Sequence, residues 1–149
     1  MSSRKIITGL FILLAAGIKA QSFSPAKEAL RLFNKYKPTI EKVNHAVVDE
    51  PKIVTGDINN DSLEDCLIYF VMTSKDGGNA ITGTETAIYL NTGKGMKVVG
   101  AFPKFSYCYG VDRIEQQVIY VSEYKCLPPY NEYVKQHKLY YWNETVIEK

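Results

Sequence analysis

Apolar residues change their spacing along the chain, and the change predicts one helix followed by a series of strands. The apolar positions with helical spacing are Ala26, Leu30, Phe33 and Tyr36. Basic residues lie between them, as expected for a helix with one apolar face. The helix should begin at Pro25, because Ser24 can cap its first free amides and a proline there loses no hydrogen bond. Pro38 should break or kink it, with a short second turn over residues 39–44.

From Lys52 onward, short runs rich in β-branched and aromatic residues alternate with Gly, Asn, Asp and Pro, a pattern typical of an antiparallel sheet. Predicted strands cover residues 52–57, 65–74, 83–91, 96–102, 106–114, 117–125 and 134–142. Residues 76–79 and 91–95 tolerate positive φ and suit hairpin turns, whereas Pro128 and Pro129 should interrupt the sheet. The predicted fold class is α+β, an N-terminal helix packed on a curled antiparallel β-meander of six or seven strands.

The first residues have a different pattern, in which Arg4 and Lys5 precede an apolar stretch over residues 6–18. This order predicts a cleavable signal peptide, because the stretch is shorter than the roughly 20 residues that cross a bilayer as a helix. Cleavage is expected after Ala20, with Gly17 as the alternative. The predicted organisation is a signal peptide over residues 1–20 and a single α+β domain over residues 21–149. That domain should be periplasmic or secreted, with no integral membrane anchor after cleavage.

Removal of the leader changes the charge balance. The full chain carries 18 basic and 16 acidic residues, but Arg4, Lys5 and Lys19 lie in the leader, which contains no acidic residue. The mature chain is therefore close to neutral. Neither nucleic acid nor an anionic membrane surface is indicated as a partner.

Three cysteines remain in the mature chain, Cys66, Cys108 and Cys126. In an oxidising compartment an odd number leaves one disulfide and one free thiol, or an intermolecular bridge. If residues 107–114 and 118–125 form a hairpin, Cys108 and Cys126 are equidistant from Gln117 and should face each other. We expect that disulfide, with Cys66 as a buried thiol. Three small apolar side chains without a bridge are the alternative.

One segment carries candidate metal chemistry, the oxygen-rich stretch over residues 57–65, called here the acidic loop. Its candidate ligands are the side chains of Asp57, Asn59, Asp61 and Asp65 and the carbonyl group of Leu63. Calcium prefers six to eight oxygen ligands, several of them carboxylates, on a backbone folded around the ion. Asn60 and Ser62 occupy positions that usually hold glycine in such loops.

The acidic loop and its flanks, over residues 55–71, resemble the calcium loop of FG-GAP and VCBS-type repeats. The motif occurs once, so a whole β-propeller is not implied. The wider order of elements is similar to small secreted bacterial proteins of unassigned function that carry one such loop. The resemblance implies a bound calcium ion that ties down the loop. Asx-turns joining two strands without an ion are the alternative.

No Gly-x-Ser-x-Gly, phosphate-loop or dinucleotide motif occurs. His45 and His137 lie in no metal-ligand spacing and are expected at the surface or a helix end. Tyrosines crowd the last third of the chain, and strand alternation should direct about half of them inward. The others could form a recognition face with the loop over residues 127–133. The candidate binding residues are Tyr130, Tyr133 and Trp142.

These features predict a non-enzymatic binding protein of inhibitor or immunity type, whose partner is another protein. The acidic loop leaves two alternatives open. One is an enzyme acting on envelope polysaccharide or peptidoglycan, and the other is a calcium-stabilised structural module without a dedicated ligand.

Overall fold

A computed structural model describes residues 23–49, 51–78, 80–100, 102–126 and 132–149. The predicted signal peptide and Tyr130 lie outside these ranges. The elements are α1 (Pro25–Val43), β1 (Ala46–Val48), β2 (Lys52–Gly56), β3 (Asp65–Ser74), β4 (Ile81–Asn91), β5 (Met96–Val99), β6 (Cys108–Glu115), β7 (Val118–Tyr124), β8 (Tyr133–Trp142) and β9 (Thr145–Glu148). No helix in the described part of the chain is long and apolar enough to cross a membrane.

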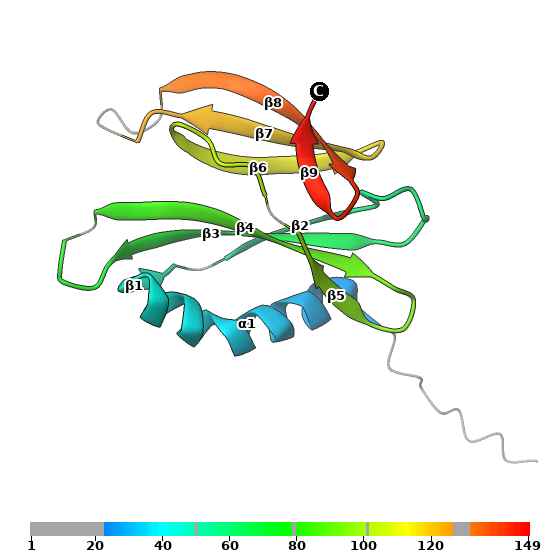
Figure 1. Cartoon of the computed structure of the whole chain (residues 1–149), viewed down its shortest axis with the longest axis horizontal. Helices are drawn as coiled ribbons and strands as arrows, with labels where there is room; N and C mark the ends of the chain where they lie inside the picture. Colours follow the sequence, from blue (N-terminus) through cyan, green and yellow to red (C-terminus); the bar gives the residue numbers. More distant parts are fainter. Residues whose placement is uncertain (1–22, 50, 79, 101, 127–131) are drawn as a thin grey trace, which may run out of the picture.

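The elements form three layers, with α1 on one face of a five-stranded sheet and a four-stranded sheet on the other (Figure 1). The predicted α+β class, with an N-terminal helix on antiparallel strands, is confirmed. The predicted single curled meander is wrong, because the strands divide into two sheets and neither is strongly curled. The chain changes layer between β5 and β6. Gly100 begins this crossing at a φ of +50°, where a Cβ would overlap the carbonyl oxygen of Glu144.

Helix α1 begins where the sequence predicts. Ser24 caps it by accepting a hydrogen bond from the Lys27 amide at 3.5 Å. The predicted break at Pro38 is wrong, because α1 continues to Val43 as one helix of 19 residues. The alternative of a kink at Pro38 stays a prediction. Phe33 before the proline and Ile40 after it both pack against the first sheet. Tertiary packing on both sides of Pro38 therefore holds the two halves in one helix.

The first sheet is built around β3, which is buried on both faces. Cys66, Ile68 and Phe70 face α1, and Leu67 faces the second sheet. Strands β2 and β1 pair with successive parts of one edge of β3, and β4 pairs with the other edge. The sequence did not predict β1, which has only three residues. Strand β5 pairs only with residues 88–91 of β4.

The second sheet is the meander β6-β7-β8-β9. Its outer hairpins turn on pairs of residues with positive φ, Gln116 and Gln117 in one and Asn143 and Glu144 in the other. Two consecutive residues in this conformation match the right-handed twist of the flanking strands. Strand β9 was not predicted. The inner face of this sheet packs on the first sheet through a core that includes Val111, Ile119, Val121 and Leu139.

Candidate functional site

The acidic loop joins β2 to β3, and Asp57 organises its backbone. One oxygen of Asp57 accepts hydrogen bonds from the amides of Asn60 and Asp61, at 2.7 and 3.3 Å. The other accepts from the Ser62 amide at 2.9 Å. Asn60 and Ser62 have φ values of +64° and +65°, a region that favours glycine. The loop thus adopts left-handed conformations at both positions where glycine is usual, without using glycine.

Two Asx-turns complete the loop. The side-chain oxygen of Asn59 accepts from the Asp61 amide at 3.2 Å, and that of Asp61 accepts from the Leu63 amide at 2.8 Å. Each bond spans two residues, as in an Asx-turn. The side-chain amide of Asn59 also donates to Asp61 at 2.9 Å. The Asx-turns that the sequence allowed as an alternative are therefore present.

Asp65 differs from the other acidic residues because it is fully buried. Its two oxygens accept from the backbone amides of Ile58 and Asn91, at 3.0 and 2.8 Å. Burial raises the pKa of this carboxyl group, while the two backbone hydrogen bonds oppose the rise. Asp65 therefore fastens the acidic loop to the end of β4.

Both oxygens of Asp65 thus bind backbone amides rather than pointing freely into the acidic loop. Within the described ranges, no three His, Cys, Asp or Glu side chains are placed to hold a metal ion. Calcium binding by Asp57, Asn59, Asp61, Leu63 and Asp65 stays a prediction from the sequence.

The candidate binding residues on β8 lie apart. Tyr133 and Trp142 are 56% and 64% exposed, but they are the first and last residues of the strand. At about 3.3 Å per residue, roughly 30 Å separates them. The Lys149 ammonium lies 5.7 Å from the Trp142 ring. Tyr133 and Trp142 therefore lie at opposite ends of β8, and a shared role in binding stays a prediction from the sequence.

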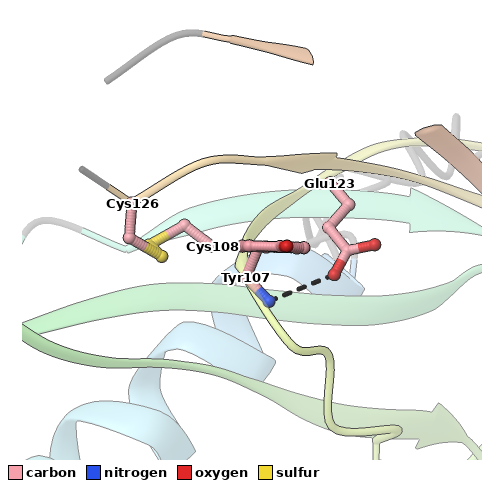
Figure 2. Close-up of a disulfide and its surroundings, with 4 residues drawn as sticks. All are labelled: Tyr107, Cys108, Glu123 and Cys126. Carbon is pink, nitrogen blue, oxygen red and sulfur yellow. Dashed lines mark hydrogen bonds between the residues drawn. A yellow bond between two sulfur atoms is a disulfide. The ribbon is translucent and has the colours of Figure 1, made fainter. Parts of the chain in front are cut away.

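Tyr133 instead pairs with Tyr124, whose other cross-strand neighbour is Cys108. Cys108 forms a disulfide with Cys126, which confirms the predicted pairing (Figure 2). The two cysteines are not directly opposite, because Cys108 pairs with Tyr124, two residues before Cys126. The offset arises from the two-residue turn and a register shift within the hairpin. Cys66 is a buried free thiol, as predicted.

Further contacts reinforce this end of the sheet. The Lys125 amide donates a hydrogen bond to the backbone carbonyl oxygen of Glu132 at 3.0 Å. The Lys125 ammonium group forms an ion pair with the Glu132 carboxylate at 2.7 Å. The Tyr124 and Tyr133 rings meet edge to face, with centroids 6.2 Å apart. The segments on both sides of residues 127–131 are therefore fixed by covalent, ionic and aromatic contacts.

A partly buried network, which sequence reasoning missed, is centred on His137. His137 was expected at the surface, and that prediction is wrong because its side chain is 3% exposed. Its Nε2 lies 2.9 Å from Glu123, and its Nδ1 lies 2.9 Å from Glu148. Strand alternation with buried Leu139 could have indicated an inward His137. Glu148 had no predicted partner because β9 was not predicted.

Glu123 links this network to the surface. Its second oxygen accepts from the Tyr107 amide at 3.1 Å (Figure 2). A hollow of about 350 Å³ beside it is lined by Phe105, Tyr107 and His137 among others. A general base needs a nitrogen within reach of its substrate, and both nitrogens of His137 are engaged by carboxylates. The arrangement therefore suits a structural role, in which His137 holds Glu123 and Glu123 positions the backbone of Tyr107.

Comparisons with protein-family models, curated proteins and solved structures found no match. The resemblance to FG-GAP and VCBS-type loops therefore rests on residues 55–71 alone.

Proposed function

We propose that this chain is an exported, non-enzymatic binding protein of inhibitor or immunity type, whose partner is another protein. The observation that carries the proposal is a group of three tyrosines and one valine at one end of the second sheet. This tyrosine face consists of Tyr107, Tyr124, Tyr133 and Val134. Three of the four, Tyr107, Tyr133 and Val134, are exposed.

The topology explains why these residues meet. Strands β6 and β8 both pair antiparallel with β7, so their first residues lie at the same end of the sheet. Tyr107 directly precedes β6, and Tyr133 begins β8. The register places Tyr124 beside both Cys108 and Tyr133.

The physical properties of this face suit protein recognition. Tyrosine combines a large apolar ring with a polar hydroxyl group and loses little conformational entropy on binding. The disulfide and the Lys125–Glu132 ion pair fix the neighbouring backbone, which lowers the ordering cost that binding must overcome. A disulfide is also typical of proteins in an oxidising compartment, which supports export.

A capture experiment with a matched control tests the proposal. Purified mature protein, Tyr133→Ala and Trp142→Ala are each used to capture partners from the extracytoplasmic fraction of the source cells. Both substitutions remove an exposed aromatic ring from β8, at opposite ends. We expect a protein that is retained by the wild type and Trp142→Ala and reduced about tenfold by Tyr133→Ala, as for an interface hot spot. Equal retention by both variants would remove the tyrosine face from the proposed function.

A further inference from the structure

Part of one edge of β4 has no strand partner in the described part of the chain. Strand β3 pairs with β4 along one side, whereas β5 on the other side pairs only with residues 88–91. Among the described residues, no strand and no backbone hydrogen bond reaches the outer edge of residues 82–87. We call this stretch the open edge. Backbone N–H and C=O groups on such an edge can pair with an added strand.

Two hollows flank the open edge, one on each face of the first sheet. The hollow on the α1 side, about 560 Å³, is walled mainly by apolar side chains that include Tyr36, Ile40, Phe70 and Val98. Three consecutive residues of β4, 85–87, also line it. These residues belong to the open edge, because β5 pairs with β4 only from residue 88 onward. The α1-side hollow therefore borders the open edge.

The second hollow, about 280 Å³, lies between residues 81–85 of β4 and the crossing segment before β6. Its lining is more polar and includes Thr82, Thr84 and Ser106. Glu85 borders both hollows. A strand added to the open edge would direct alternate side chains into the apolar and the polar hollow.

We propose that the open edge binds an extended peptide segment of a protein partner as an additional strand. Main-chain hydrogen bonds to residues 82–87 would supply affinity, and the two hollows would select alternate side chains. The inference rests on the proposed function only in taking a protein as the partner. It adds a recognition site built from β4 and α1, elements that contribute nothing to the tyrosine face.

The charge of the edge specifies the peptide further. The side chain of Glu85 is exposed, and within the described ranges no hydrogen bond or ion pair engages it. Its cross-strand neighbour Phe70 faces α1, so Glu85 projects from the same face, beside the apolar hollow. The bound segment should therefore carry apolar side chains on the α1 side, with a lysine or arginine opposite Glu85.

The same charge disfavours a second copy of this chain as the occupant. Two copies paired antiparallel along residues 82–87 would bring their Glu85 carboxylates to neighbouring positions across the new strand pair. Like charges in that position are destabilising. A heterologous segment with a basic residue has no such repulsion.

The test uses the mature protein and a capped peptide, Thr-Val-Thr-Lys-Thr-Val-Thr, which places lysine between two valines in either strand direction. A second peptide has glutamate in place of lysine, and a third has N-methyl groups on alternate amides, which prevent strand pairing. NMR titration of the backbone amides and amide hydrogen exchange measure the binding. Glu85→Lys is the test variant, and Asp76→Lys, an exposed acid in the β3–β4 turn, is the matched control.

We expect the wild type and Asp76→Lys to prefer the lysine peptide over the glutamate peptide by about tenfold, and Glu85→Lys to reverse the preference. Amides of residues 82–87 should shift and exchange more slowly, and the N-methylated peptide should not bind. The proposal is overturned if no peptide binds, if Glu85→Lys keeps the lysine preference, or if the N-methylated peptide binds equally. Concentration-dependent dimerisation through the open edge would instead identify a second copy as the occupant. Loss of partner capture by Tyr133→Ala is a separate outcome, so the two proposals can fail independently.

Discussion

Asp65 connects the acidic loop to the core, and its replacement by alanine should destabilise the whole fold. The substitution leaves the buried amides of Ile58 and Asn91 without acceptors. Each buried donor that loses its partner costs about 1–3 kcal/mol. Alanine also removes the cost of burying the Asp65 carboxylate, which offsets part of this loss. We therefore expect the free energy of unfolding to fall by about 3 kcal/mol. Against a typical total of about 5–15 kcal/mol, the variant should remain folded but be clearly weakened.

Urea unfolding at neutral pH, followed by circular dichroism, measures the effect. Asp65→Asn keeps one acceptor oxygen and should lose about half as much stability as Asp65→Ala. Asp61→Ala is the matched control in the same loop. Asp61 is exposed and its backbone partner is the exposed Leu63 amide, so water can replace the lost bond and the cost should stay below about 1 kcal/mol. If Asp65→Ala loses no more stability than Asp61→Ala, the described role of Asp65 is wrong.

The raised pKa of Asp65 adds a dependence on pH. Burial, its largest cause, favours the protonated form in the folded protein. The stability that this group contributes is therefore greatest below its ordinary pKa of 3.8, and it falls as pH rises through the raised folded value. The stability advantage of the wild type over Asp65→Asn should shrink from acidic pH towards neutrality. An advantage that grows over that range would show that the carboxylate form is the one stabilised.

Four further predictions concern the rest of the molecule. Cys66 is buried and its thiol pKa is raised to about 12. Iodoacetamide should therefore label Cys66 only after the protein unfolds, as detected by mass spectrometry. Replacing Cys108 and Cys126 together by serine should cost about 3 kcal/mol in urea unfolding, from the loop entropy of their separation of 18 residues; a loss below 1 kcal/mol would contradict this. His137→Ala should cost about 3 kcal/mol in urea unfolding, because one oxygen of buried Glu123 loses its partner. Glu148→Ala removes a half-exposed side chain and should cost under about 1 kcal/mol. Calcium should raise the melting temperature relative to chelator if the acidic loop binds it; an unchanged temperature would contradict the predicted calcium site.

Several features could be predicted from the sequence because they depend on residues close together in the chain. Helical spacing and the Ser24–Pro25 pair located the start of α1. Period-two runs between turn residues located seven of the nine strands in the described ranges, to within a few residues. The spacing about one hairpin turn predicted the Cys108–Cys126 disulfide, although not its offset, which follows from a register shift.

Other features depended on contacts between distant segments. Strands β1 and β9 are short, and each is stabilised by a longer strand beside it. α1 continues through Pro38 because both halves pack on the first sheet. His137 is buried because its neighbours on β7 and β9 supply two carboxylates. Strand alternation could indicate that His137 points inward, but no local pattern identifies the partners in these contacts.

The sequence by itself determined the start of the helix, seven of the strands, the glycine-containing turns over residues 76–79 and 91–95, and which acidic side chains gather in one loop, because these depend on local sterics and periodicity. Only the tertiary structure decided that the strands form two sheets, that Asp65 binds amides of the core, and that residues 82–87 keep an open edge. The physical reason is that strand pairing and burial are set by the free energy of packing whole faces together, to which residues far apart in the chain contribute jointly.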